Sequence, residues 1–148
     1  MSYKGLFKPK HPNKYKGDPS NIVFRSSWEL KFMNYLDAHE DVITWSSEEF
    51  CIPYRSPVDG AVHRYFPDFW LKQRKLDGTI ETVVVEIKPK KQTMPPEPQK
   101  KRTKRYINEV MTWGVNSAKW QAAQKFCESK NWKFAIFTEN HLGISLNG

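Results

Sequence analysis

A carboxylate and an ammonium group lie two residues apart in the stretch VVVEIKPKK, residues 83–91. Side chains alternate along a β-strand, so Glu86 and Lys88 would point to the same face of it. Buried strands seldom carry such charges unless the two groups are paired or bind a ligand. One interpretation is a half-exposed strand on which Lys88 forms an ion pair with Glu86. The other is a metal site beside a segment that binds a polyanion, because further lysines follow directly.

A second acid, Asp68, lies among aromatic residues in FPDFWL, where an unpartnered carboxylate is costly. Whether it meets Glu86 depends on the turn between the two strands. A two-residue Asp-Gly turn would place the acids on opposite faces. A three-residue loop over residues 76–78, with its glycine in the left-handed conformation, pairs Lys75 with Thr79 and sets Asp68 opposite Glu86. A bulge beside the proline of FPD would do the same, and the metal-site interpretation requires this register.

The chemistry of such an acid pair follows from its charge. Two adjacent carboxylates repel each other unless a cation lies between them. Mg²⁺ and Mn²⁺ prefer hard oxygen ligands, and the backbone carbonyl of Ile87 would be a further ligand. Lys88, on the same face, could hold an attacking water or stabilise charge that grows on a phosphate. A metal and a lysine beside a basic segment describe phosphodiester hydrolysis.

The elements that position these residues follow from hydrophobic periodicity. Helical spacing predicts a first helix in SSWELKFMNYLDAHE, where Ser26 and Glu29 match an S-x-x-E capping box. Glu29 is a third acid to compare with the other two; its alternative role is only that of cap partner, and the two roles are compatible. Three strands, a short helix, a longer helix with Asn116 as N-cap and a last strand follow at residues 48–55, 62–73, 79–88, 105–113, 116–131 and 132–139. This order predicts an α/β fold with a mixed sheet flanked by helices.

Two basic segments dominate the charge of the chain, which is +8 in total. The first 20 residues carry five lysines and one aspartate, a net +4, and residues 88–105 carry eight lysines or arginines and one glutamate, a net +7. The rest of the chain is therefore −3. Such clustering is typical of proteins that bind nucleic acids, and the alternative is a solvated tail plus a solvated loop.

One domain is expected from 148 residues. It would cover residues 23–148, with a basic Pro-rich loop at 89–105, and an extended basic arm over residues 1–22 would precede it. No apolar run approaches the roughly 18 residues that cross a bilayer, and the N-terminus lacks the apolar core of a secretory signal. Neither basic segment has the amphipathic face of a membrane-surface helix. Two cysteines fit a reducing compartment, so we expect a cytosolic protein without a membrane partner.

Several short motifs resemble those of a known nuclease superfamily. FPD (residues 66–68) followed by EIK (residues 86–88) resembles the PD-(D/E)XK motif, and FRSSWELKFMNYLD resembles the helix that supplies the first acid of that fold. More narrowly, F-R-S-x-W-E, YFPDF, E-I-K-P and F-x-I-F-T-E are similar to motifs of phage head completion nucleases and of the related subunit that cleaves transposon ends. The resemblance spans about residues 24–139. This chain keeps the acid of E-x-K, which some transposon relatives replace.

The resemblance implies a restriction-endonuclease-like core of order α-β-β-β-α-β and a divalent metal, Mg²⁺ or Mn²⁺, as cofactor. It implies Glu29, Asp68 and Glu86 as catalytic metal ligands and Lys88 as the catalytic lysine. It also implies DNA as the substrate, portal or neck proteins as partners, and a location in the host cytoplasm with association to the virion. Contacts to the DNA backbone, without reading of its sequence, are expected from the basic residues Lys8, Lys10, Lys14, Lys16, Lys90, Lys91, Lys100, Lys101, Arg102, Lys104 and Arg105.

Other polar residues have two possible roles each. Glu48 and Glu49 could help to bind a second metal, or they are ordinary strand or turn acids. His39 and His63 lack the spacing of metal ligands and are expected to be structural or surface residues. Lys119, with two nearby glutamines, could approach DNA phosphates or lie on a solvated helix face.

The leading hypothesis is therefore a Mg²⁺-dependent endonuclease that hydrolyses phosphodiester bonds of phage DNA during head completion. One alternative is a head or neck assembly protein that binds DNA without cleaving it, and the intact acids count against it. The other is a transposase-type subunit that cleaves DNA ends. A chain of 148 residues leaves little room for the partner-docking domain that such a subunit needs.

Overall fold

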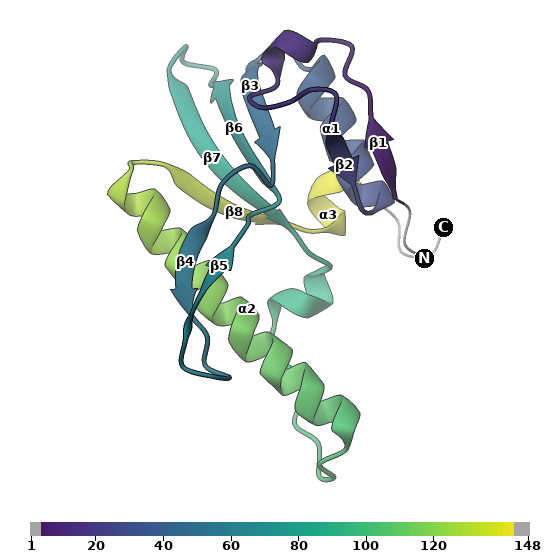
Figure 1. The fold of residues 1–148 in the computed structure, drawn as a ribbon, viewed down its shortest axis with the longest axis vertical. Helices are drawn as coiled ribbons and strands as arrows, with labels where there is room; N and C mark the ends of the chain where they lie inside the picture. The colour runs from purple at the N-terminus through teal and green to yellow at the C-terminus, as the bar shows by residue number, and fades with distance from the viewer. Residues whose placement is uncertain (1–3, 144–148) are drawn as a thin grey trace.

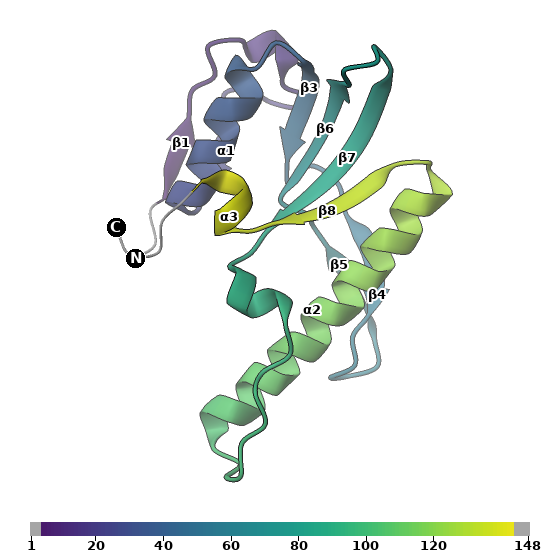
Figure 2. The same ribbon diagram turned by 180° about the vertical axis from the view of Figure 1, so that it is seen from behind.

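The computed structural model describes residues 4–143, and its centre is a four-stranded mixed sheet (Figure 1). The strands lie in the order β3 (Val42–Ser47), β6 (Phe69–Arg74), β7 (Ile80–Ile87) and β8 (Lys133–Phe137). The first three pair antiparallel, whereas β8 runs parallel to β7. The main helices are α1 (Ser27–Ala38) and α2 (Lys104–Ser129), and Figure 2 shows the same arrangement from behind. This architecture confirms the predicted α/β class with a mixed sheet flanked by helices.

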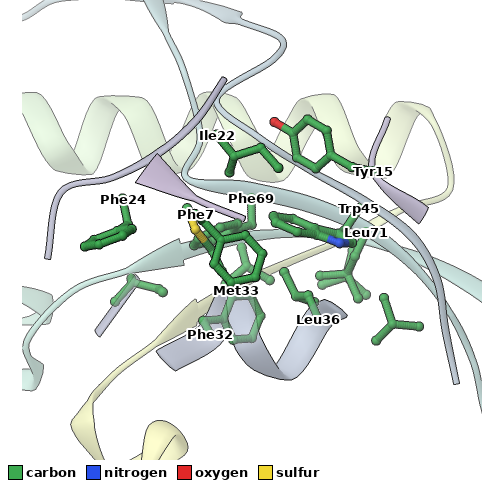
Figure 3. Close-up of a cluster of buried hydrophobic side chains, with 14 residues drawn as sticks. Phe7, Tyr15, Ile22, Phe24, Phe32, Met33, Leu36, Trp45, Phe69 and Leu71 are labelled. Carbon is green, nitrogen blue, oxygen red and sulfur yellow. The ribbon is translucent and has the colours of Figure 1, made fainter. Parts of the chain in front are cut away.

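Alternation of side chains along the strands builds two hydrophobic layers. On one face of the sheet, Phe69 of β6 meets Phe32 of α1 with ring centroids 5.0 Å apart (Figure 3). On the other face, Trp70 of β6 and Val84 of β7 pack with Cys127 of α2. The sheet is therefore buried on both sides, as expected for strands with long apolar runs.

The strands differ from the predicted ones in two places. The sequence pattern does not predict β3, although Trp45 at its centre is fully buried against the α1 side. The run predicted at 62–73 is two strands, β5 (Val62–Tyr65) and β6. Pro67 separates them, because proline has no N–H to donate to a ladder. β5 pairs with β4 (Ile52–Arg55) in a separate hairpin that contacts α2, so the predicted strand at 48–55 lies outside the central sheet.

The turn between β6 and β7 has the three-residue form that the acid pair requires. The N–H of Lys75 donates to the carbonyl of Thr79 at 2.8 Å, and the N–H of Gly78 donates to the carbonyl of Lys75 at 2.9 Å. Gly78 has φ +86°, in the left-handed region that favours glycine. The ladder then runs from Arg74 paired with Ile80 to Phe69 paired with Val85. The predicted register is therefore confirmed.

The two helices predicted at 105–113 and 116–131 are one continuous helix, α2, of 26 residues. Thr103 is its N-cap, whose side chain accepts from the N–H of Tyr106. Gly114 lies in the helix interior, where glycine costs about 1 kcal/mol relative to alanine, and Asn116 is a buried helix residue rather than a cap. Packing of Trp120 and its neighbours against the β4–β5 hairpin offsets that cost. Neither this helix nor any other within residues 4–143 is long and apolar enough to cross a membrane.

α1 begins where the sequence predicts, because the Ser26 side chain accepts a hydrogen bond of 3.1 Å from the N–H of Glu29. The described part of the expected N-terminal arm packs against this helix. It forms β1 (Gly5–Phe7), the 3-10 turn η1 (Pro12–Lys14) and, from Ile22, the paired strand β2 (Ile22–Phe24). Phe7 and Tyr15 are buried in the α1-side core. This segment is therefore integrated into the fold over much of its length.

Two short elements complete the chain. η2 (Lys90–Thr93) follows β7, and α3 (Glu139–Leu142) follows β8. The N–H of Lys90 donates to Oε1 of the buried Glu139 at 2.9 Å, which fixes the path of the chain just beyond the end of β7.

Candidate active site

Asp68 and Glu86 form a close carboxyl pair at the end of the sheet where β6 begins and β7 ends. The N–H of Asp68 donates to Oε1 of Glu86 at 3.3 Å, and the N–H of Ile87 donates to Oδ2 of Asp68 at 2.8 Å. Glu86 is only 6% exposed. Burial, followed by the charge of Glu86, raises the pKa of Asp68 well above its usual value. A buried pair of this kind fits a site for a cation.

Glu29, near the start of α1, is the third predicted acid. Its Oε2 accepts from the Ser26 hydroxyl at 3.4 Å. Burial, and then the charge of Glu48, raise the pKa of Glu29, while hydrogen bonds at Arg25 and Ser26 oppose the rise. The charge of Glu29 in turn raises the pKa of Asp68, so the helix carries this acid toward the pair. The capping role and a role in the site coexist.

The three acids do not yet form a closed metal site. Across residues 4–143, no three His, Cys, Asp or Glu side chains lie close enough together to hold a metal ion. Asp68 and Glu86 are in contact, and Glu29 acts on Asp68 through its charge. The three-ligand set stays a prediction, and it requires the Glu29 side chain to turn toward the pair when a cation binds. The role of the Ile87 carbonyl stays a prediction in the same way.

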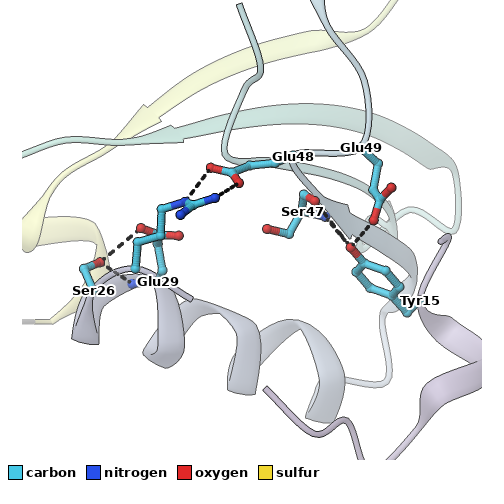
Figure 4. Close-up of polar contacts among 7 residues, drawn as sticks. Tyr15, Ser26, Glu29, Ser47, Glu48 and Glu49 are labelled. Atoms are coloured by element: carbon cyan, nitrogen blue, oxygen red, sulfur yellow. Dashed lines mark hydrogen bonds and ion pairs between the residues drawn. The ribbon is translucent and has the colours of Figure 1, made fainter. Parts of the chain in front are cut away.

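Arg25 and Glu48 are two charged residues beside these acids that the sequence analysis did not assign to the site. Nε and Nη2 of Arg25 donate to the two carboxylate oxygens of Glu48 at 3.4 and 3.2 Å. Glu48 follows β3 and has φ 53°, in the left-handed region, and its N–H donates to the carbonyl of Asp68 at 3.2 Å. Figure 4 shows Glu29 and Glu48 approaching from α1 and from the end of β3. Because β3 is not predicted, only the FRS motif before Glu29 could have pointed to Arg25.

Tyr65, the last residue of β5, links the hairpin to the acid pair. It is 3% exposed, and burial, followed by the charge of Glu86, raises the pKa of its hydroxyl. Among the described residues this hydroxyl finds no partner at ordinary hydrogen-bond geometry. The ammonium of Lys119 lies over the rings of Tyr54 and Tyr65, 5.8 and 5.6 Å from their centroids. Lys119 is therefore a neighbour of the site rather than a residue on a free helix face.

Lys88 lies two residues beyond Glu86, and its N–H continues the parallel pairing by donating to the carbonyl of Phe137 at 3.0 Å. The side chain is half-buried. Of the ion pairs between residues 4–143, none joins Lys88 to Glu86. The structure thus gives no support to the interpretation in which the two residues only pair with each other.

The remaining acid and histidine candidates have structural roles. Glu49 accepts from the Tyr15 hydroxyl at 2.8 Å, and Figure 4 shows this contact on the far side of Ser47 from Glu48. His63 pairs with Asp59 at 2.7 Å at the tip of the hairpin. His39 is the C-cap of α1. These positions agree with the expectation that none of the three is a metal ligand.

The basic residues fall into two groups. In the N-terminal segment, Lys14 is occupied, because its ammonium donates to the last carbonyls of α1, those of Leu36, Asp37 and His39, at 2.8, 3.0 and 2.9 Å. Its predicted contact to DNA is therefore replaced by a structural role. The other predicted DNA-binding residues are exposed: Lys8, Lys10, Lys16, Lys90, Lys91, Lys100, Lys101, Arg102, Lys104 and Arg105.

The basic loop and the first turns of α2 stand away from the body of the protein (Figures 1 and 2). Between them lies a groove of about 1440 Å³, which starts at Lys91, three residues beyond Lys88. Basic, proline and aromatic side chains line it, among them Lys100, Arg105 and Tyr106. This groove places a cationic surface next in the chain to the candidate active site.

Comparisons with known proteins agree with this geometry. A family model described as TnsA-like endonuclease N terminal matches residues 39–139, which include Asp68, Glu86 and Lys88. The chain is also 44% identical over 146 residues to the head completion nuclease of Enterobacteria phage T4, in an alignment that covers 96% of this chain and 95% of that protein. Both matches are to nucleases.

Proposed function

Since the chain belongs to the TnsA-like endonuclease family, we propose that it is a divalent-metal-dependent DNA endonuclease that hydrolyses phosphodiester bonds of phage DNA during head completion. The observation that carries the proposal is the buried pair of Asp68 and Glu86, held face to face by the backbone at the end of the sheet. A protein that only bound DNA would have no use for two mutually repelling buried acids beside a third. The head-completion role rests on the relative from phage T4, with which the chain aligns over nearly its whole length.

The proposed metal ligands are the carboxylates of Glu29, Asp68 and Glu86 and the carbonyl of Ile87. Burial and repulsion from Glu86 disfavour the ionised form of Asp68, and a divalent cation would relieve both. Bound Mg²⁺ or Mn²⁺ would supply polarisation of the phosphoryl oxygen and offset charge on the leaving oxygen.

Lys88 is the residue proposed to act on the reacting atoms. Its ammonium, on the same strand face as the Glu86 carboxylate, would orient a water molecule for in-line attack on phosphorus or hold the charge that develops on the phosphate. The P–O bond to the leaving strand would then break as the new P–O bond forms. The burial of Glu86 beneath the hairpin residue Tyr65 excludes water from that side of the acid pair.

The exposed lysines and arginines of residues 88–105 would grip the DNA backbone without reading its sequence. Backbone contacts of this kind release counterions, so binding should weaken steeply as salt rises. The groove beside α2 is the surface proposed for this contact.

Cleavage of supercoiled plasmid tests the function. Wild type with Mg²⁺ or Mn²⁺ should nick or linearise the plasmid, whereas Asp68→Asn and Lys88→Ala should not. Lys75→Ala is the matched control, because it removes an exposed lysine at the opposite end of β7. Intact plasmid with wild type, or normal cutting by Asp68→Asn, would reject the nuclease proposal.

A second candidate is a head or neck assembly protein that binds DNA without cutting it, and the exposed basic loop favours it. This candidate predicts that wild type retards plasmid in a gel but leaves it intact with either metal. The transposase-type alternative has less support, since the relative that aligns over 95% of its own length is a head completion nuclease. For either phage role we propose portal or neck proteins as partners, and the infected host cytoplasm and the virion as locations.

A further inference from the structure

Arg25 occupies an unusual position for an arginine. It precedes the N-cap of α1, and its guanidinium is surrounded by acids, since Glu48, Glu29 and Asp68 all raise its pKa. Two of these acids belong to the proposed metal set. Once a divalent cation neutralises that set, the guanidinium is no longer needed there as a counter-charge, and it becomes available to an anion.

The pair with Glu48 holds the guanidinium by one edge. Glu48 contacts Nε and Nη2 of Arg25, so the edge formed by Nη1 and Nη2 is left for a second acceptor. This fork of donors matches two oxygens of a phosphate. The side chains of Arg25 and Glu48 are 54% and 30% exposed, so DNA in solution can reach them.

The pair is better explained by positioning than by stability. Exposed ion pairs contribute little to folding. Yet Glu48 sits at φ 53°, a backbone conformation that is costly for any residue other than glycine, and its N–H is tied to the carbonyl of Asp68. Strain of this kind is concentrated at functional sites. Here it fixes the Glu48 carboxylate, and through it the guanidinium, relative to the acid pair.

We propose that Arg25 binds a backbone phosphate of the DNA strand that is cut, and that Glu48 is a positioning residue that orients the Arg25 guanidinium rather than a metal ligand. This inference rests on the proposed nuclease function for its meaning, but its first test does not depend on cleavage.

The first test is DNA binding without divalent metal. Fluorescence anisotropy of a labelled duplex, with EDTA and over a salt series, should show Arg25→Gln binding about tenfold more weakly than wild type, because a charge-assisted contact is lost. The slope of log affinity against log salt should become shallower by about one unit. Arg74→Gln is the matched control, since it removes the same charge from an exposed residue at the other end of β6. Equal affinity and slope for the two variants would overturn the proposal.

Arg25→Lys gives a second measurement that keeps the charge. It should recover the salt slope but not the full affinity, because an ammonium lacks the two-donor fork. Melting temperatures of both Arg25 variants should stay within a few degrees of wild type, as expected for an exposed pair. If Arg25→Lys bound DNA as tightly as wild type, the proposed two-donor contact would be excluded.

The second test separates positioning from metal binding. Titration calorimetry with Mn²⁺ should give the same affinity for Glu48→Ala as for wild type, and Asp68→Asn should bind at least tenfold more weakly. In single-turnover cleavage, Glu48→Ala should slow wild type but should not slow Arg25→Gln further, because the two residues act as a unit. Weakened Mn²⁺ binding by Glu48→Ala, or an additive loss of rate, would refute the positioning role.

The two proposals fail in different ways. If wild type cut no DNA with any metal, the nuclease function would fall, while the anisotropy series would still decide whether Arg25 binds phosphate. If wild type cut DNA and Arg25→Gln matched Arg74→Gln, the nuclease would stand and the role of Arg25 would fall.

Discussion

The N–H of Ile87 donates a hydrogen bond of 2.8 Å to Oδ2 of Asp68, so the strand that carries one acid of the site holds the side chain of the other. The N–H of Asp68 makes the reciprocal contact to Oε1 of Glu86 at 3.3 Å. Both contacts depend on the β6–β7 register, since a slip of one residue would turn every side chain of a strand to the other face. The acid pair is thus a consequence of the three-residue turn at the far end of the sheet.

Stability of the metal-free protein should fall as pH rises above the unfolded-state pKa of an aspartate, about 3.9. The folded pKa of Asp68 is raised by burial and by Glu86, so between the two pKa values the folded state keeps a proton that the unfolded state has lost. Stability from this group is therefore present at low pH and is lost as pH rises through the folded pKa. Urea unfolding in EDTA at a series of pH values measures it.

Asp68→Asn is the control for this pH dependence. Acids whose pKa values are lowered, such as Glu81, are common to both proteins, so the difference between them isolates Asp68. The variant should be more stable than wild type at pH 7 and similar at pH 4. If the difference did not change with pH, the pair would not carry the repulsion described here.

Lys14→Met should destabilise the fold by about 1–3 kcal/mol, because three carbonyls at the end of α1 lose a charged donor. Its effect on DNA affinity should be small for the fraction that is folded. Lys8→Met, which removes an exposed lysine of the same segment, should unfold like wild type. Chemical denaturation measures both, and equal midpoints for the two variants would contradict the structural role of Lys14.

Gly114→Ala should stabilise the protein by about 0.5–1 kcal/mol, since alanine is favoured over glycine inside a helix. An added Cβ would lie 3.6 Å from Cγ of Pro57, an ordinary contact. If a helix ended at residue 114, as the sequence pattern predicts, alanine would be unfavourable there instead. A lower urea midpoint for Gly114→Ala would therefore argue against one continuous α2.

Gly78→Ala should cost about 1–2 kcal/mol, because the residue has φ +86° and an L side chain is strained there even though no atom lies within 4 Å of the added Cβ. Gly78→Asn should cost less, since asparagine tolerates the left-handed conformation. Equal stability of all three proteins would contradict the turn geometry that sets the register of the acids.

Much of the site could be predicted because it depends on local rules. The meeting of Asp68 and Glu86 follows from alternation along two strands and from the length of one loop, all within about 20 residues of sequence. The cap at Ser26 follows from a four-residue pattern in the same way. Such features need no knowledge of which distant segments pack together.

The features that were missed depend on distant packing. Arg25 and Glu48 are 23 residues apart and meet only because β3 pairs with β6, and the pattern of β3 is too weak to predict a strand. α2 was divided at Gly114 because a glycine followed by an asparagine resembles a helix end; burial of Trp120 against the hairpin decides otherwise. Lys14 resembles any solvated lysine until the end of α1 is placed beside it.

The most direct test of the account is a crystal structure with Mn²⁺ bound, located by its anomalous scattering. We expect one strong peak in contact with carboxylate oxygens of Asp68 and Glu86 at about 2.1–2.2 Å, with the Glu29 side chain turned to join them. An absent peak at saturating Mn²⁺, or a peak held by other residues, would contradict the claim that these three acids form the metal centre of a nuclease.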